Sequence, residues 1–233
     1  MITVAKPHAR QHRSDHAESG VLPGQIRVLV VDDHPAVRIG LRELLEDQPD
    51  FWLVDALATA EAAVSVAEDQ AIDVAVVDYQ LGGRNGLWLS RKLKRLPRPP
   101  RVVIYSAYCD GMLAAASVVA EADGLVSKAG LGSDLCDAIR NVARGRPLLR
   151  PVPPQLAELI RRRLDEEEQA IFGMLLARIE PAEIASTLGI SSATLESRLW
   201  TMLRALEAVH TEPASVYRDG GGLRRRPDRA VVS

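Results

Sequence analysis

The stretch "VLVVDDHPAVRIG", residues 28–40, places four apolar residues directly before two adjacent carboxylates, Asp32 and Asp33. A short apolar run of this kind predicts a buried parallel strand, and the residues after it predict a helix. Two like charges so close together raise each other's cost of ionisation unless a cation lies beside them. The stretch therefore predicts a strand-to-helix junction that holds a cation.

The composition is that of an ordinary globular protein. The chain has 233 residues, of which 47% are hydrophobic and 26% charged. No run approaches the roughly 18 apolar residues of a membrane span, and the polar N-terminus lacks the apolar core of a secretory signal. We therefore expect a cytoplasmic protein with no membrane association. Cys109 and Cys136 match no metal or redox spacing, so each is expected to be a packed residue.

Strand-like and helix-like patterns alternate over the first two thirds of the chain. Helical spacing is clear in Val37, Leu41, Leu44 and Leu45. Such alternation predicts a five-stranded, parallel, doubly wound α/β sheet of the flavodoxin-like kind, which binds ligands at the carboxyl ends of its strands. The predicted strands are 26–31, 51–56, 73–77, 101–105 and 123–127.

The remaining residues are helical in pattern. Pro181 suits a first helical turn, Gly189 a turn and Ser191 the N-cap of a longer helix, which together predict a helix-turn-helix. Four apolar residues share one face of that longer helix: Leu195, Leu199, Met202 and Leu206. We expect a disordered leader, an α/β domain, a linker with a short helix, a small all-α domain and a disordered basic tail, over residues 1–25, 26–144, 145–163, 164–210 and 211–233.

Polar residues of suitable chemistry follow the predicted strands. They are Asp32 and Asp33, then Asp78, Ser106 and Lys128. Converging carboxylates suit Mg²⁺, which prefers oxygen ligands, and a carboxylate such as Asp78 can attack phosphorus to form an aspartyl phosphate. Lys128 and Ser106 would then contact phosphoryl oxygens. Any one aspartate alone could be a turn former or a helix cap, but five such residues at one edge predict a phosphoryl acceptor.

These motifs make residues 26–144 resemble the receiver domain of bacterial two-component response regulators. "VVDDHP", "VVDYQLGGRNG", "YSA" and "SK" stand where that family has its acidic pair, acceptor, hydroxyl residue and lysine. The resemblance implies that a sensor histidine kinase phosphorylates Asp78 and that Asp32, Asp33 and Asp78 hold Mg²⁺. It also implies that Ser106 and Lys128 sense the phosphoryl group.

Two positions depart from the family pattern. Leu125 stands three residues before the lysine, where the family usually has an aromatic residue that swings inward, and Gly82 stands where proline is common. Neither change affects the acceptor chemistry. Leu125 affects how phosphorylation reaches the rest of the protein, because leucine cannot reproduce the aromatic packing.

The C-terminal segment resembles the four-helix DNA-binding domain of NarL/LuxR-class regulators, with the helix after Ser191 as the recognition helix in the major groove. Glu196 has the wrong sign for a phosphate; it could accept from a cytosine amino group or simply be solvated. Trp200 could contact DNA or form packing or interface surface. The candidate DNA-binding residues are Ser192, Thr194, Glu196, Ser197, Arg198, Trp200 and Arg204.

Charge weakens the DNA-binding interpretation. Residues 164–208 include three basic and eight acidic residues, a net charge of −5, whereas DNA affinity depends largely on neutralising phosphates. Basic clusters at 161–163 and 224–226 flank this segment. Either could reach a DNA backbone, and either could equally be a solvated charge run.

The leading hypothesis is a transcriptional regulator that is phosphorylated on Asp78, binds promoter DNA and forms a homodimer when phosphorylated. The alternative is a signalling adaptor whose C-terminal helices bind a protein. A third possibility, an Mg²⁺-dependent phosphatase, would need a substrate-covering cap and a second general acid. The sequence between Asp33 and Asp78 supplies neither, so we do not expect an enzyme.

Overall fold

The structure, a computed structural model, describes residue 22 and residues 24–211. The predicted leader over 1–25 and tail over 211–233 lie outside the described residues except at residues 22, 24, 25 and 211. For residues 208–211 only the helical backbone is described.

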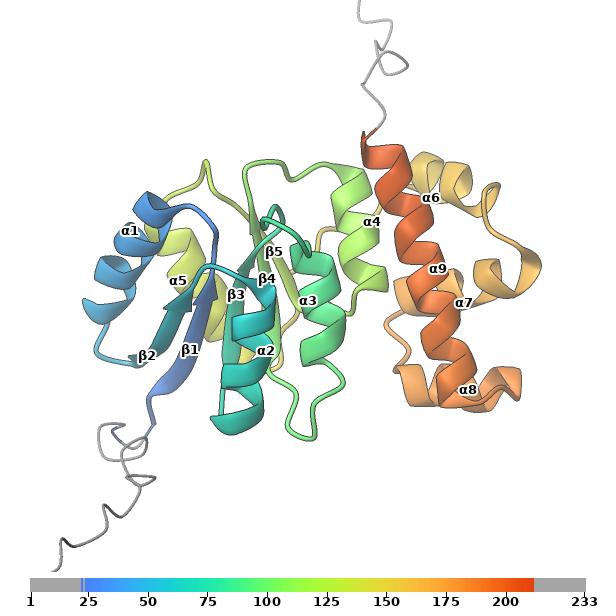
Figure 1. Cartoon of the computed structure of the whole chain (residues 1–233). Helices are drawn as coiled ribbons and strands as arrows, with labels where there is room; N and C mark the ends of the chain where they lie inside the picture. Colours follow the sequence, from blue (N-terminus) through green and yellow to red (C-terminus); the bar gives the residue numbers. More distant parts are fainter. Residues whose placement is uncertain (1–21, 23, 212–233) are drawn as a thin grey trace, which may run out of the picture.

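A single parallel sheet forms the centre of the first half of the chain (Figure 1). Its strands are ordered β2-β1-β3-β4-β5, and each neighbouring pair is parallel. The prediction of a five-stranded parallel sheet is confirmed, with every strand bound within one residue of the structure. The strands are β1 (Ile26–Val31), β2 (Phe51–Leu57), β3 (Val74–Asp78), β4 (Arg101–Ser106) and β5 (Gly124–Ser127).

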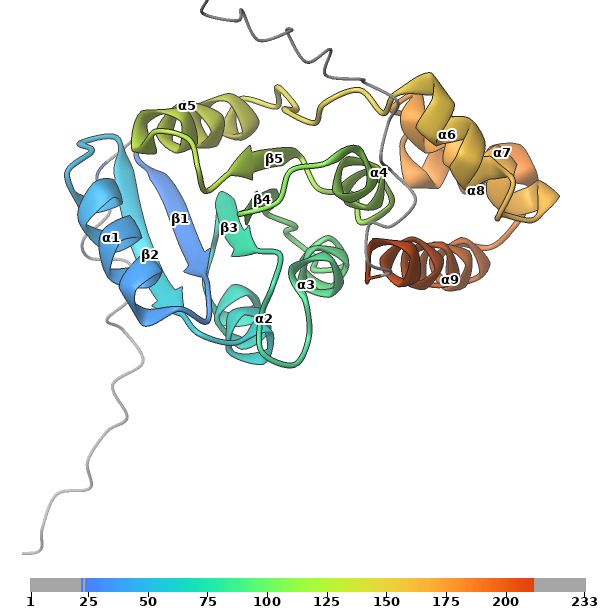
Figure 2. The same ribbon diagram turned by 90° about the horizontal axis from the view of Figure 1, so that it is seen from above.

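Five helices cover the two faces of the sheet (Figure 2). Helices α1 (Pro35–Glu46) and α5 (Gly132–Ala143) pack on one face; α2 (Ala60–Asp69), α3 (Gly86–Leu93) and α4 (Gly111–Val119) pack on the other. Each face has its own apolar cluster, because the buried strands are apolar on both sides. We call residues 26–144 the α/β half.

Side-chain caps set where several helices begin. Asn85 Oδ1 accepts from Trp88 N–H at 2.9 Å at the start of α3, and Asp110 Oδ1 accepts from Leu113 N–H at 2.8 Å at the start of α4. Each bond satisfies one of the four N–H groups that a helix leaves without an intrahelical partner. The caps fix where α3 and α4 leave the carboxyl edge of the sheet.

Residues 154–211 fold into four helices, which we call the helical half: α6 (Pro154–Arg161), α7 (Glu166–Leu176), α8 (Pro181–Leu188) and α9 (Ser192–Thr211). As predicted, Pro181 begins α8, and Gly189 ends it in a left-handed conformation with φ 66°. Ser191 Oγ accepts from Thr194 N–H at 3.0 Å, the predicted N-cap bond of α9. The helix-turn-helix pattern is therefore present between α8 and α9.

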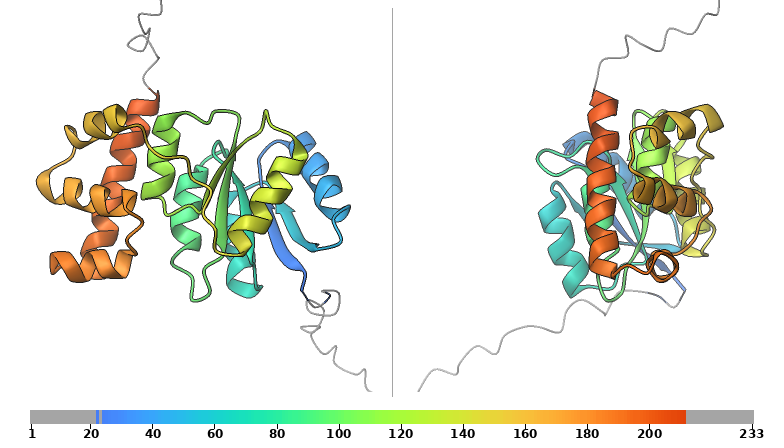
Figure 3. Two further views of the ribbon diagram at one scale, coloured as in Figure 1. Left: turned by 180° about the vertical axis from the view of Figure 1, so that it is seen from behind. Right: turned by 90° about the vertical axis from the view of Figure 1, so that its right-hand side faces the viewer.

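The two halves share one apolar core through α4 (Figure 3). Every α4 residue from 113 to 119 is buried, since the sheet covers one side of the helix and α6, α7 and α9 cover the other. At the start of α4, a side chain on Gly111 would lie 2.7 Å from Leu156 Cδ2 of α6. The helical half is thus closely packed against the α/β half.

Within the described residues, the helices are all too short or too polar to cross a membrane.

Candidate functional site

Three strand ends bring charged side chains together at the carboxyl edge of the sheet. Asp32 follows β1, Asp78 ends β3 and Lys128 follows β5. Lys128 Nζ lies 2.6 Å from Asp32 Oδ2 and 2.9 Å from Asp78 Oδ2. The side chains of Asp32 and Asp78 are 1% and 4% exposed, so this lysine neutralises two buried carboxylates at once.

Ser106 lies at the end of β4, next to β5 in the same edge. Its hydroxyl is buried and accepts a hydrogen bond from Tyr108 N–H at 3.1 Å. The backbone carbonyl of Ser106 accepts from Lys128 N–H at 2.8 Å. Ser106 is therefore joined to the backbone of Lys128 and begins the loop that leads to α4.

Two basic residues of the stretch "DDHPAVR", residues 32–38, belong to the pocket, although the sequence analysis assigned them no role. His34 Nδ1 lies 2.7 Å from Asp33 Oδ1 and 3.9 Å from Asp78 Oδ2. Arg38 Nη1 donates to the Asp32 carbonyl at 2.7 Å. The available signal was their position at the first turns of α1, directly after the acidic pair.

A backbone hydrogen bond accounts for glycine at position 82, where the family commonly has proline. The Gly82 N–H donates to Asp33 Oδ2 at 3.1 Å, a bond that proline could not make because it has no N–H. The loop after Asp78 thereby closes onto Asp33. Leu125, the other departure, is buried in the same apolar cluster as the residues of α4. Its side chain therefore already faces the core.

Burial dominates the electrostatics of the acceptor. Burial raises the pKa of the Asp78 carboxyl above its ordinary value; Lys128 opposes this rise and the charge of Asp32 adds to it. Burial alone would lower the pKa of Lys128, but its bonds to Asp32 and Asp78 raise it. Both pKa values are therefore raised. Two carboxylates offset the burial of Lys128, whereas Asp78 has only one lysine to offset its own burial. An additional cation would favour the ionised form of Asp78.

The same residues have the donor set of a divalent cation site. Asp32, Asp33, His34 and Asp78 each offer one ligand atom, and these atoms lie within 4.8 Å of one another. Asp33 Oδ1 and Asp78 Oδ2 are buried and make no well-formed hydrogen bond with the described residues. Buried carboxylate oxygens with spare lone pairs are what a hard cation requires, so an ion fits this group.

Helix α9 has three faces, and the candidate DNA-binding residues lie on two of them or at their margins. The predicted apolar face of Leu195, Leu199, Met202 and Leu206 is buried, as expected. A second face meets the α/β half through Glu196, Trp200 and Glu207, which share one side of the helix because they lie four and then seven positions apart. The third face is exposed and carries Thr194, Ser197, Thr201 and Arg204. We call these the core face, the docked face and the outer face.

The candidates Ser192 and Arg198 lie at the margins of these faces. Ser192 is exposed in the first turn. Arg198 bonds to Asp165 Oδ2 at 2.7 Å and pairs with Glu167, so its charge is used within the helical half.

Four charged residues join the docked face to the α/β half. Arg91 of α3 has a fully buried side chain and pairs with Glu121 and Glu196. Arg95 Nη2 lies 2.6 Å from Glu121 and 2.5 Å from Glu196. Burial lowers the pKa of Arg91, and the two glutamates oppose that shift. Glu196 is therefore a partner of the α/β half in this structure.

Two further contacts extend the docked face along α3. The guanidinium of Arg91 lies over the Trp200 ring, 5.7 Å from its centroid. Asn85 Nδ2 donates to Glu207 Oε1 at 2.7 Å. Because Asn85 precedes Arg91 whereas Glu207 follows Glu196, α3 and α9 run antiparallel, and α3 covers the side of α9 that holds Glu196 and Trp200.

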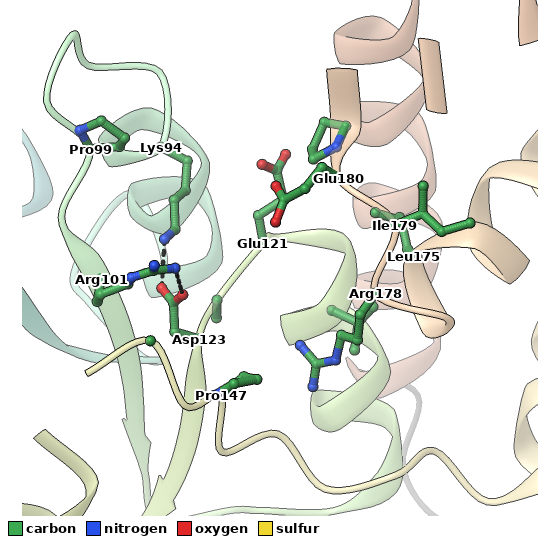
Figure 4. Close-up of a pocket in the computed structure, with 14 residues that line it drawn as sticks. Lys94, Pro99, Arg101, Glu121, Asp123, Pro147, Leu175, Arg178, Ile179 and Glu180 are labelled. Atoms are coloured by element: carbon green, nitrogen blue, oxygen red, sulfur yellow. Dashed lines mark hydrogen bonds and ion pairs between the residues drawn. The ribbon is translucent and has the colours of Figure 1, made fainter. Parts of the chain in front are cut away.

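A cleft of about 570 Å³ separates the halves away from the acceptor pocket (Figure 4). Asp123 in its wall binds Lys94 Nζ at 2.5 Å and Arg101 Nη1 at 2.9 Å. Three basic and three acidic residues line the cleft, so its charges balance and none of the predicted site residues belongs to it. This cleft and the candidate chemistry are thus in different places.

Comparison with known proteins identifies the first half. Residues 28–140 match the response regulator receiver domain family. The chain belongs to the two-component response regulators, in the NarL/LuxR class. This response regulator is 29% identical over 191 residues to the response regulator UvrY of Escherichia coli K12, covering 78% of this chain and 88% of that protein.

Solved structures agree with the fold of this response regulator. A two-component response regulator of the LuxR family from Aurantimonas sp. SI85-9A1 matches with a TM-score of 0.52 at 29% identity, covering 60% of this chain and 97% of that one. The response regulator RcsB in complex with DNA matches with a TM-score of 0.52 at 23% identity, over 78% of this chain and 92% of that one. The second likeness extends the shared fold to the helical half.

Proposed function

We propose that this response regulator accepts a phosphoryl group on Asp78 from a sensor histidine kinase and controls transcription by binding promoter DNA through its helical half. The observation that supports acceptor chemistry most directly is the convergence of Asp32, Asp78 and Lys128 at one edge of the sheet. The shared fold with a DNA-bound regulator, together with the helix-turn-helix of α8 and α9, supports DNA as the target of the output.

In the proposed transfer, an Asp78 carboxylate oxygen attacks the phosphorus of a phosphohistidine. The new O–P bond forms as the P–N bond breaks, and the histidine nitrogen takes up a proton. Asp32, Asp33 and Asp78 would hold Mg²⁺, which when bound neutralises charge on the transferring group. Lys128 would exchange its contact with Asp78 for a phosphoryl oxygen, and Ser106 would donate its hydroxyl to another.

Helix α4 is the proposed route from the acceptor to the output. Ser106 lies within four residues of the Asp110 cap of α4, and Cys109 Sγ lies 3.7 Å from the Ser106 carbonyl. On its other side α4 packs against α9. A new hydrogen bond from Ser106 would shift this loop and α4, and therefore change how α9 is held. We propose that the phosphorylated form dimerises, so that two half-sites contribute to DNA affinity.

The test combines phosphorylation and DNA binding. Wild type and Asp78→Asn are treated with acetyl phosphate and Mg²⁺, and the intact mass is measured; only wild type should gain one phosphoryl group. Both proteins are then used to select duplexes from random sequence, with and without beryllofluoride. Enrichment of one motif that strengthens with beryllofluoride in wild type alone is expected.

Labelling of Asp78→Asn would overturn the acceptor assignment. Absence of enrichment in wild type under both conditions would overturn DNA binding, and would favour the adaptor function, in which the acidic helical half binds a protein.

A further inference from the structure

The cleft between the two halves is large enough to hold a small organic molecule. Its volume of about 570 Å³ falls within the range of roughly 300–1,000 Å³ that is usual for ligand pockets. The α/β half forms one wall through the end of α4, the start of β4 and the segment after α5, and the helical half forms the other through the loop between α7 and α8. A molecule bound there would therefore contact both halves at once.

Two helices end at this cleft with a charged residue in a position that favours glycine. Glu121 follows α4 with φ 57° and Arg178 follows α7 with φ 62°, and they are the two non-glycine residues with a positive φ among the described residues. In both cases the next backbone N–H bonds to a carbonyl five residues back, a helix ending that usually places glycine in the left-handed conformation. Gly145 and Gly189 do so after α5 and α8. The side chains of Glu121 and Arg178 are thus kept in spite of backbone strain.

The structure shows what Glu121 binds, and it leaves Arg178 available. Glu121 pairs with Arg91 and Arg95. The guanidinium of Arg178 makes no hydrogen bond or ion pair with the described residues, and in Figure 4 it points into the cleft toward Pro147. A guanidinium binds a carboxylate or a phosphate through two parallel N–H groups. Arg178 is therefore placed to bind an acidic group inside the cleft.

The charges of the lining favour an anionic ligand. Asp123 is shared between two of the three lining cations, and Glu121 is neutralised by two arginines that do not line the cleft. Three cations therefore face two available carboxylates, those of Asp123 and Glu180. Glu180 is exposed and makes no capping bond at the start of α8, so its oxygens can accept from hydroxyl groups. The remaining lining residues are glycine, proline or aliphatic, which suits an uncharged carbon skeleton.

We propose that the cleft binds a small hydroxylated organic anion, with its carboxylate or phosphate on Arg178 and its hydroxyl groups on Glu180. Because the two walls belong to different halves, the bound anion stabilises the contact between them. The site is separate from the acceptor pocket, and its ligand is independent of DNA binding.

Glucose 6-phosphate and gluconate are suitable probes, because they share a hydroxylated six-carbon skeleton and differ in the acidic group. Glucose is the uncharged control. Melting temperatures of the full chain are measured without Mg²⁺, and dissociation constants are measured by calorimetry. At about ten times its dissociation constant, a bound probe should raise the melting temperature of wild type by about 3 °C, whereas glucose should not. A response to one probe alone would identify the acidic group as a phosphate or as a carboxylate.

Arg178→Gly tests the assignment without weakening the fold, because glycine suits the left-handed conformation at this position. Without a probe, the variant should melt at or above the melting temperature of wild type. Its affinity for the probe should fall roughly tenfold or more. The control Arg161→Ala removes an exposed cation at the end of α6, outside the cleft, and should respond as wild type does.

Three results would overturn the proposal. They are the absence of a shift with both probes, an equal response to glucose, and equal affinity for the probe in Arg178→Gly and wild type. None of them would alter the proposed phosphorylation of Asp78 or the proposed DNA binding, which are tested separately by intact mass and by duplex selection.

Discussion

Gly86 shows how closely the backbone packs around the acceptor. A side chain at this position would place its Cβ 2.2 Å from the carbonyl oxygen of Asp78 and 3.0 Å from Val77 Cγ1. The first of these contacts is with backbone, which cannot rotate away as a flexible side chain can. The acceptor strand and the start of α3 can therefore approach one another only because residue 86 is glycine.

We predict that Gly86→Ala lowers the free energy of unfolding by about 1–3 kcal/mol, because the added methyl overpacks a closed site. Gly40→Ala is the matched control. Gly40 lies inside α1 with nothing within 4 Å of its Cβ position, so the same change should raise stability by about 0.5–1 kcal/mol. Urea denaturation measures both. Equal effects of the two variants would contradict the close approach at Gly86.

Lys128 gives a second prediction at this scale. Its ammonium neutralises both Asp32 and Asp78, so Lys128→Ala should leave Mg²⁺ affinity intact or increase it, as measured by calorimetry. The variant should nevertheless lose the increase in DNA affinity caused by beryllofluoride, because it has no ammonium at position 128 to contact the group that replaces the phosphoryl. Arg144→Ala, an exposed cation elsewhere, should behave as wild type in both measurements. A normal beryllofluoride response in Lys128→Ala would remove this residue from the switch.

Single residues in the acceptor pocket were predictable because each follows an apolar strand. The run before Asp32 and the run ending at Asp78 give the strand ends directly, and parallel strands bring their ends to one edge. The buried state of Arg91 was not predictable in this way. Its partner Glu196 lies 105 positions away, and the periodicity of one helix carries no information about a helix so distant in sequence.

Helix α4 is the element whose sequence carried an unused signal. The segment "GMLAAASVV" is apolar or small on every side, a pattern that predicts a helix covered all round. A helix on the surface of an isolated α/β half would have one polar face. The composition of α4 thus already implies a second covering element, which the structure identifies as α6, α7 and α9.

The contact between α9 and α3 depends on Glu196, which yields a prediction for these two elements. We expect Glu196→Gln to lower the free energy of unfolding by about 1–3 kcal/mol, because Arg91 stays buried with one carboxylate fewer. Glu183→Gln, an exposed residue of α8 with no ion pair among the described residues, should change stability by less than about 0.5 kcal/mol. Urea denaturation of the full chain compares them, and a similar loss in both would show that the pair with Arg91 contributes little.

At the scale of the whole molecule, the two halves are joined by an apolar core and by ion pairs of limited exposure. The apolar contact through α4 contributes irrespective of pH, because the side chains of α4 carry no ionisable group. The ion pairs contribute only while their carboxylates are ionised. The pH dependence of stability can therefore separate the two contributions.

Burial alone would raise the pKa of the Glu196 carboxyl, but Arg91 and Arg95 hold it below its ordinary value of 4.5. A carboxyl whose pKa is lowered by folding stabilises the folded state above its unfolded pKa, and this stabilisation is lost as the pH falls through the folded pKa. The difference in free energy of unfolding between wild type and Glu196→Gln should thus be constant from about pH 8 to 5.5 and shrink only below about pH 4.5. Urea denaturation across this range measures the difference. If this difference instead declined between about pH 8 and 6, the coupling would belong to a group that titrates near neutrality, such as a histidine. The Arg91–Glu196 pair would then not be the main electrostatic link between the halves.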